Sequence, residues 1–301
     1  MVPLFDLHCD TLLEAYNLGC SLEHNLLHIS LDKASVFSPY FQITSIWSDK
    51  NLTDDEAFIK ALKIAQHYKS SGIKFITDVN ALTNGGFILG IEDARLLNNS
   101  LDRLEQLYQL GARVLTLNWK ENSCIGGGFN TDIGLTDFGV EVVKKCAELG
   151  IIVDLSHSSN EVFHNVTNLV SRFGFSPIAS HSNSFSICSH KRNLTDAQIR
   201  SLISLSSVVG ISLVSEHIDL SGATKYDVLK HVSHILSLGG ENLLCLGCDF
   251  DGCTNLVQGI CGIEDLEALF SLFTQEFGYD IAKKIFFENA YDFFSKNLKG
   301  G

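Results

Sequence analysis

Residues 4–12 read LFDLHCDTL, and this stretch decides between the two folds that the chain allows. The stretch Leu4–Cys9, which is mostly apolar, is typical of a buried strand, and polar residues gather at its end. A doubly wound open sheet usually carries a glycine-rich phosphate loop after its first strand. The chain has His-Cys-Asp-Thr at that place, which favours a barrel of alternating strands and helices.

Other short apolar runs follow along the chain. Most of them are continuous rather than alternating, as strands covered on both faces of a parallel sheet are. The eight predicted strands are Leu4–Cys9, Phe41–Trp47, Phe87–Ile91, Val114–Leu117, Ile151–Asp154, Pro177–Ser180, Val208–Leu213 and Leu243–Gly247.

Helix signals lie between these runs. Thr53–Glu56 and Thr195–Gln198 have the capping-box pattern, Gly72 ends the first of these helices, and Thr136 and Gly150 bound another. Residues 225–240 predict a further helix, and two more are expected over 263–297. Eight strands alternating with helices predict an α/β protein, a single (β/α)8 TIM-type barrel domain over residues 1–301.

The composition is that of a globular protein with an acidic balance. Its 22 Lys and Arg against 35 Asp and Glu give a net charge of −13 with neutral histidines. A field of this sign repels a polyanion, so we expect no nucleic-acid partner. No apolar run reaches the ~18 residues of a membrane span, and the N-terminus lacks the pattern of a signal peptide. We therefore expect no membrane partner and a cytoplasmic location.

The nine cysteines are scattered without framework spacing, which is typical of reduced, mostly buried thiols. Cys245 and Cys248 have the spacing of a redox or zinc-knuckle motif. They lie in the strand-like run LLCLGC, where residues three apart point to opposite faces. A structural role is therefore favoured for both.

Histidines and carboxylates recur at the C-terminal ends of the predicted strands, where the active site of such a barrel forms. They are His8, Asp10, Glu92, Asp93, Asp154, His157, His181, Asp249 and Asp251. Packing alone does not require this joint occurrence. The other histidines are expected to be structural: His24, His28, His67, His164, His190, His217, His231 and His234.

Three imidazoles with carboxylates suit Zn²⁺ or a similar divalent ion. The set is larger than one catalytic zinc takes while it keeps an open position. Two metals that share one carboxylate would use all of it, and two such ions lower the pKa of a bridging water. The sequence therefore predicts a metal site at the C-terminal ends of the strands.

Six segments resemble the renal, or membrane, dipeptidase family of zinc peptidases, whose members are amidohydrolase-like barrels. The segments are DLHCDTL (6–12), LGIEDA (89–94), RVLTLNWKEN (113–122), GLTDFGVEVVKKCAELGIIVDLSH (134–157), IASHSNSFSICSHKRNLTDAQI (178–199) and LGCDFDG (246–252). The likeness runs in the same order from about residue 4 to residue 255, and so covers most of the chain.

The resemblance implies a ligand set for two zinc ions per chain. His8 and Asp10 would bind one ion, and His157 and His181 would bind the other. Glu92 would bridge the two. Each of these residues stands where the family's motif has its ligand.

The resemblance also implies the residues that act on the substrate. Asp249 would take the proton of the attacking water and pass it to the leaving amine. Arg192 would hold the terminal carboxylate of the substrate, and a guanidinium fork suits that role because it grips a carboxylate bidentately. The implied reaction is hydrolysis of a dipeptide by a hydroxide that bridges the two zinc ions.

One position departs from the family. Mammalian members carry a histidine after the fourth strand that contacts the substrate carbonyl, and this chain has Trp119 there. An indole N–H donates one hydrogen bond but cannot become cationic, so Asn118, Asn122 or the metals would polarise that carbonyl. Related barrels bridge their metals with a carbamylated lysine, for which Lys120 is roughly placed, but Glu92 is the favoured bridge.

The resemblance thus implies a zinc metallopeptidase acting on dipeptides, with L,D-dipeptides among its substrates. Two alternatives stay open. One is another binuclear metal amidohydrolase acting on a cyclic amide, a lactone or a phosphoester, and the other is a metal-loaded peptide-binding relative without catalysis. The family forms dimers, so a homodimer is one arrangement that the resemblance allows.

Overall fold

A computed structural model describes residues 1–299, which form two compact units. The first unit comprises Met1–Thr44 and Ala179–Phe294, and the second comprises Ser45–Ile178 and the segment that begins at Ser295. The chain passes from one unit to the other at Thr44–Ser45, inside a strand. It returns at residues 178–179, where both residues make strand-type bridges.

The first unit contains four parallel strands in the order β2-β1-β7-β6. They are β1 (Val2–Cys9), β2 (Phe37–Trp47, up to Thr44), β6 (Val209–Ile211) and β7 (Leu244–Leu246). Its helices are α1 (Thr11–Leu18), α2 (Leu31–Ala34), α7 (Asp196–Ser204), α8 (Ser215–Ile218), α9 (Val228–Ser237), α10 (Leu266–Phe277), α11 (Tyr279–Lys283) and α12 (Asn289–Asn297, up to Phe294). Short 3-10 or π segments are η3 (Gly240–Asn242), η4 (Ile263–Asp265) and η5 (Lys284–Glu288).

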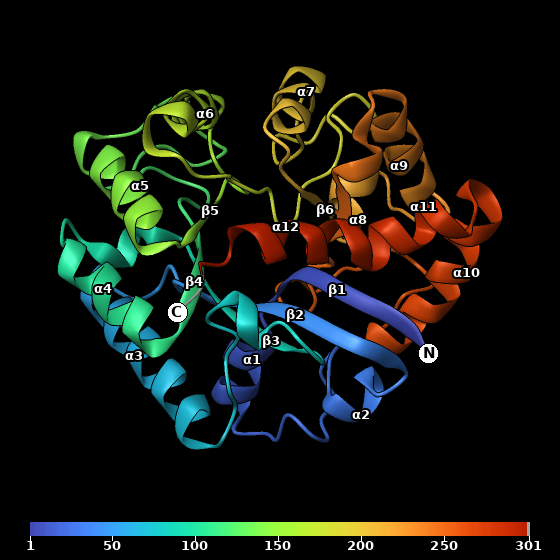
Figure 1. Ribbon diagram of the computed structural model, residues 1–301, viewed down its shortest axis with the longest axis horizontal. Coiled ribbons are helices and arrows are strands. Elements are labelled where there is room, and N and C mark those ends of the chain that lie inside the picture. Colours follow the sequence, from blue (N-terminus) through green and yellow to red (C-terminus); the bar gives the residue numbers. More distant parts are fainter. Residues whose placement is uncertain (300–301) are drawn as a thin grey trace. The chain divides into compact units, whose positions relative to one another are not determined.

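Strand β1 lies at the centre of this unit, beside β2 (Figure 1). Every residue from Leu4 to Cys9 is buried, and this includes the polar Asp6 and His8. The Phe5 ring packs on Phe41 and Phe294, with ring centroids 5.2 and 5.0 Å apart. Burial of one such aromatic side chain contributes about 2–3 kcal/mol, so this cluster fixes the strand whose end carries His8.

Two glycines allow the backbone of residue 180 to approach β6 and β7. A Cβ atom added at Gly210 or Gly247 would lie 1.9 or 1.8 Å from the carbonyl oxygen of Ser180. No side chain fits at such a distance. The two glycines therefore let the segment that carries His181 sit directly against the ends of these strands.

The second unit contains three parallel strands in the order β5-β4-β3. They are β3 (Gly86–Glu92), β4 (Ala112–Thr116) and β5 (Ile152–Asp154). The helices are α3 (Asp54–Ser70), α4 (Leu101–Leu110), α5 (Asp137–Leu149) and α6 (Asn160–Phe173), with short 3-10 turns η1 (Val79–Ala81) and η2 (Ala94–Leu97). Helix α4 packs between α3 and α5, and α5 packs on α6 (Figure 1).

Most of the predicted elements are present. The capping boxes at Thr53 and Thr195 both form, and α5 begins after Thr136 and ends at Gly150 in the left-handed conformation. The predicted strand Pro177–Ser180 is reduced to isolated bridges at residues 178 and 179. The structure therefore has seven strands within residues 1–299 rather than the eight that were predicted. In place of two C-terminal helices it has α10, α11, η5 and α12.

The cysteines match the prediction of reduced thiols. All nine are free, and Cys245 and Cys248 are fully buried. Burial raises the pKa of both thiols well above the usual range, which keeps them protonated and inert. A redox or zinc-knuckle role is therefore not supported.

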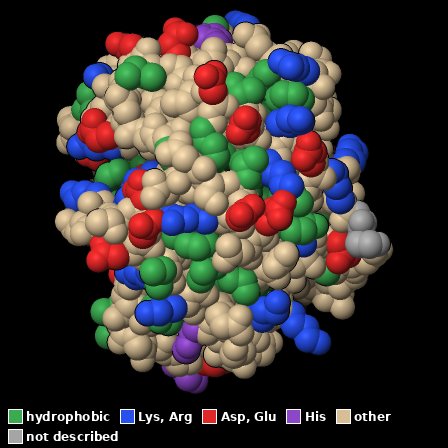
Figure 2. All heavy atoms as spheres, turned by 90° about the vertical axis from the view of Figure 1, so that its left-hand side faces the viewer, with side chains coloured by type: hydrophobic (Ala, Val, Ile, Leu, Met, Phe, Trp, Pro, Cys, Tyr) green, Lys and Arg blue, Asp and Glu red, His purple; other side chains and the backbone are tan. Residues whose placement is uncertain are grey.

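The surface mixes charges of both signs. On the face drawn in Figure 2, positive and negative side chains are interspersed with hydrophobic ones. The net charge of −13 is therefore not gathered into one patch on that face. In the described part of the chain, no helix combines the length and apolar character that a membrane crossing requires.

We expect the chain to unfold in a single cooperative transition, because β2 continues from one unit into the other. Both tryptophans, Trp47 and Trp119, lie in the second unit, whereas far-UV ellipticity reports the helices of both units. Denaturant curves followed by tryptophan fluorescence and by ellipticity should therefore have the same midpoint. Two separated midpoints would show that the units are independent domains. The single domain over residues 1–301 stays a prediction until then.

Candidate metal centre

The ends of β1 and β7 bring His8, Asp10 and Asp249 together in the first unit. Beyond the two strands, the Asp249 N–H donates to the carbonyl of His8 (3.1 Å) and the Asp10 N–H to that of Phe250 (2.9 Å). His8 Nε2 then lies 3.5 Å from Asp10 Oδ2 and 3.8 Å from Asp249 Oδ1. His8 and Asp10 are almost fully buried, and the Asp249 side chain is 12% exposed. Two carboxylates thus converge on one imidazole.

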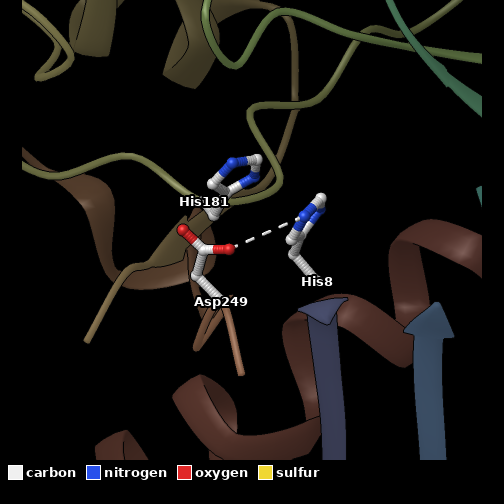
Figure 3. A group of neighbouring side chains, drawn as sticks. All are labelled: His8, His181 and Asp249. Carbon is white, nitrogen blue, oxygen red and sulfur yellow. Dashed lines mark ion pairs between the residues drawn. The ribbon is translucent and has the colours of Figure 1, made fainter. Parts of the chain in front are cut away.

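His181 completes this group. Its ring stacks on that of His8 with centroids 3.8 Å apart, and Figure 3 shows both rings beside the Asp249 carboxylate. Ser180 Oγ lies 2.7 Å from His181 Nδ1 and so fixes the ring. One ligand atom each from His8, His181 and Asp249 fall within 4.8 Å of one another. This is the spacing of side chains that hold a metal ion.

Gly252 packs closely against the carboxylates of Asp10 and Asp249. A Cβ atom at residue 252 would lie 2.4 Å from Asp10 Oδ2 and 2.4 Å from Asp249 Oδ1. The glycine therefore leaves room for the two carboxylates to point inward. Two buried carboxylates beside two stacked imidazoles fit a divalent cation. Such a cation would neutralise the buried negative charge and accept lone pairs from the imidazole nitrogens.

Four of the residues that follow strands have a positive φ, which residues other than glycine rarely adopt. The φ angles are 64° at Asp249 and at Asp251 in the first unit, and 68° at Asp93 and 66° at His157 in the second. Such conformations cost roughly 1–3 kcal/mol each and cluster at functional sites. Asp251 has a structural reason for its position: its carboxylate accepts bonds from Thr11 Oγ1 (2.5 Å) and the N–H of His28 (2.7 Å).

The second unit places Glu92 beside His157. In the strand register Glu92 pairs with Thr116, and Thr116 pairs with Asp154, so the ends of β3, β4 and β5 are level. His157 Nε2 lies 2.9 Å from Glu92 Oε1, and both side chains are buried. Both residues therefore lie at strand ends, and their side chains are in contact.

The candidates after β4 differ in burial. Asn118 is fully buried, and within residues 1–299 neither atom of its amide has a hydrogen-bond partner. Asn122 and Lys120 are exposed. Trp119 lies near His157, with ring centroids 6.3 Å apart. Of the two asparagines, only Asn118 therefore has the unsatisfied buried amide of a ligand-binding side chain, and exposure disfavours Lys120 as a metal bridge.

Trp47 was missed by the sequence analysis. Its ring packs on Trp119 with centroids 5.0 Å apart, and its buried Nε1 has no partner among the described residues. Its position at the end of β2 is the only signal that the sequence offers for it.

Arg192 is buried and is attached to the segment that carries His181. Its Nη2 donates to the His181 carbonyl (2.7 Å) and its Nη1 donates to Ser182 Oγ (3.1 Å). The whole Arg192 residue is only 4% exposed, which is unusual for arginine. The sequence alone gave no indication of this burial.

Burial also acts on two carboxyl groups next to the predicted ligands. Desolvation raises the pKa of Asp6 to about 6, although its Oδ1 accepts the N–H of Cys248 at 2.9 Å. In the second unit desolvation raises the pKa of Asp93 to about 7, despite Arg95 at 3.5 Å. The Asp6 carboxylate thus joins β1 to the segment after β7, whereas the Asp93 carboxylate contacts Arg95 of the following turn.

Comparisons with known proteins agree with this description. The model of the membrane dipeptidase family, peptidase family M19, matches residues 1–296. An uncharacterized dipeptidase of Schizosaccharomyces pombe is 33% identical over 201 residues, which are 62% of this chain. That match covers 47% of the relative, so the chain spans about half the length of the curated protein that it matches.

Two solved metallopeptidases share the fold. The dipeptidase AC of family M19 has a TM-score of 0.90 at 24% identity, and the likeness covers 99% of both chains. A metallopeptidase of Rhodobacter sphaeroides, bound to a phosphinate mimic of the dipeptide L-Ala-D-Ala, has a TM-score of 0.90 at 23% identity, with 98% of this chain and 99% of that chain covered.

These likenesses confirm the predicted α/β fold class, since the related structures are barrels of the amidohydrolase-like type. The family model extends over nearly the whole chain and includes every predicted site residue. The chain therefore belongs to the membrane dipeptidase family, peptidase family M19.

Proposed function

We propose that the protein is a metal-dependent dipeptidase. The observation that carries this proposal is the buried group of His8, Asp10, His181 and Asp249, with Arg192 bonded to the His181 carbonyl. It combines donors for a metal ion with a cation that suits a substrate carboxylate. Family membership supports the same reaction.

We propose two zinc ions as the metals. His8 and Asp10 would hold one ion, His157 and His181 would hold the other, and Glu92 would be the shared ligand. Within each unit, the short distances of His8 to Asp10 and of His157 to Glu92 support this assignment. When bound, zinc supplies Lewis acidity and brings the pKa of a water that it holds close to neutral.

Asp249 is proposed as the general acid and base. Its carboxylate takes a proton from the attacking water and gives it to the departing amine, so that one group serves both steps. The side chain reaches toward His8 from a strained backbone position and keeps a slightly exposed edge. The carboxylate can therefore reach both the metal ligands and the substrate.

Arg192 and Asn118 are proposed to position the substrate. The Arg192 guanidinium holds the free carboxylate one residue beyond the scissile bond, which limits substrates to dipeptides. The unsatisfied amide of Asn118 donates to a substrate carbonyl, in the role that Trp119 cannot fill as a cation. Asn122 and Trp119 are proposed to line the substrate-binding site without polarising the carbonyl.

We propose L,D-dipeptides among the substrates. The support is a relative: the Rhodobacter sphaeroides metallopeptidase binds a phosphinate mimic of L-Ala-D-Ala. The cytoplasmic location and the homodimer stay predictions from the sequence.

The test is hydrolysis of L,L-, L,D- and N-acylated dipeptides by the purified protein. It is run as isolated, after chelation, and after zinc is restored. Cleavage that chelation removes and zinc restores would support the proposal. Absence of cleavage with two zinc ions bound per chain would overturn it and favour another metal hydrolase.

Arg192→Met is expected to lower kcat/KM for free dipeptides by roughly 10–150-fold, mainly through KM, because a hydrogen bond to a charged group contributes about 1.5–3 kcal/mol. The same variant should leave the slow cleavage of dipeptide amides almost unchanged, since these lack the carboxylate. Arg192→Lys keeps the positive charge but not the bidentate geometry, so its kcat/KM for free dipeptides should lie between those of the wild type and Arg192→Met. An equal loss on both substrates would mean that Arg192 acts only by holding the His181 carbonyl.

A further inference from the structure

A second group of metal-binding side chains lies in the first unit, among residues that the metal centre does not use. His190, Glu216 and His217 each offer a ligand atom, and these atoms lie within 4.8 Å of one another. The two imidazole rings have centroids 4.9 Å apart and are tilted by 40°. His217 is buried, His190 is half-buried and Glu216 is exposed. The group therefore has a closed side and an open side.

Hydrogen bonds fix the two segments that carry these residues. Asn193 Nδ2 donates to the carbonyls of Cys188 (2.9 Å) and His217 (2.8 Å). Cys188 Sγ donates to the Glu216 carbonyl (3.5 Å). Helix α8 and the loop before Arg192 are thus joined at several points. The backbone that carries the three side chains is therefore fixed before an ion arrives, which lowers the entropy cost of binding one.

The hydrogen-bond contacts of the two imidazoles leave a ring nitrogen of each for a metal. His217 Nδ1 lies 3.3 Å from Ser212 Oγ, and a proton on Nδ1 would leave the lone pair on Nε2. His190 Nδ1 accepts the Arg192 N–H at 3.3 Å, a long contact that a metal bond can replace.

The open side gives an ion access from solvent. Glu216 borders a cavity of about 640 Å³ that is also lined by Asp219 and Ser221. Two imidazole nitrogens and one carboxylate oxygen are a common ligand set for zinc, with water in the fourth position. We propose that His190, Glu216 and His217 bind a zinc ion separate from the metal centre. The sequence hides this group, because His190 stands far along the chain from Glu216 and His217 and neither histidine follows the strand-end pattern.

The test compares zinc uptake by the wild-type protein with that of His190→Gln and Glu216→Gln. Each protein keeps the ions of its metal centre and is dialysed against rising zinc concentrations, and bound zinc is counted. The wild-type chain should take up one more ion than either variant. The affinity for that ion should fall at least ~10-fold in each variant, since even outer-shell changes lower metal affinity by 10–100-fold.

The matched control is His24→Gln, which removes an exposed imidazole that pairs with Asp32 in the same unit. It should take up the additional zinc as the wild type does. A second readout is the NMR spectrum of ¹⁵N-histidine-labelled wild-type protein, in which the ring signals of His190 and His217 should shift together. Equal uptake by the wild type and Glu216→Gln, or unmoved ring signals at saturating zinc, would overturn the proposal.

Discussion

Asp249→Asn is expected to keep its bound metal and to lose most of its turnover. Asparagine has nearly the same shape as aspartate but cannot accept a proton, so the variant loses the general acid and base. Proton transfer by one positioned group contributes typically 10²–10⁴-fold, and kcat should fall by about that factor. Steady-state kinetics on a dipeptide, together with a count of bound zinc, would measure both effects.

Asp251→Asn is the matched control, since Asp251 has the same left-handed backbone conformation. Its carboxylate bonds to Thr11 and to the His28 backbone, so the change should lower Tm and leave kcat within a few-fold of wild type. An unchanged kcat in Asp249→Asn would remove the proposed role. Loss of zinc together with kcat would instead make Asp249 a metal ligand, which its distance of 3.8 Å from His8 Nε2 also permits.

Local signals in the sequence predicted local structure well. The capping boxes at Thr53 and Thr195 depend only on residues three apart, and both form. The prediction of a strand over Pro177–Ser180 was wrong, because strand pairing there depends on partners that are distant in the sequence. Residue 178 bridges to β5 and residue 179 to β6, and β5 and β6 are only three residues long, so no continuous ladder forms.

The C-terminal helices show a second limit. A hydrophobic pattern of helical period continues through residues 263–297, so it predicts helices there but not every interruption. Gly278, with φ of 87°, separates α10 from α11, and the π segment η5 separates α11 from α12. Gly278 is the kind of stop signal that separates two helices, whereas the π segment keeps the chain helical and has no such signal.

Site residues were predictable where they follow strands and unpredictable where burial decides. His8, Glu92 and His157 stand at strand ends, and the order of the strands is enough to find them. The choice between Asn118 and Asn122 depends on solvent exposure, which differs completely between two residues only four positions apart. The same reason hid Trp47, whose buried N–H has no sequence signature.

Glu92→Gln is expected to empty both zinc positions rather than one. A bridging carboxylate binds two ions at once, and it also reduces the repulsion between them. Neutralising it removes a ligand from each ion and leaves their charges less compensated. Bound zinc should fall from about two ions per chain toward none, and kcat/KM should fall by about 10³-fold or more, because each metal supplies several kcal/mol of stabilisation.

Two control variants separate the bridge from its neighbours. His157→Asn removes a ligand that lies 2.9 Å from Glu92 but is assigned to one ion only, so it should release one zinc and retain the other. Asp93→Asn changes the next carboxylate, which faces Arg95 at 3.5 Å, and should retain both. If Glu92→Gln released one ion only, Glu92 would be an ordinary ligand. If it released none, the exposed Lys120 would return as the candidate bridge, and the two-metal assignment would need a different carboxylate.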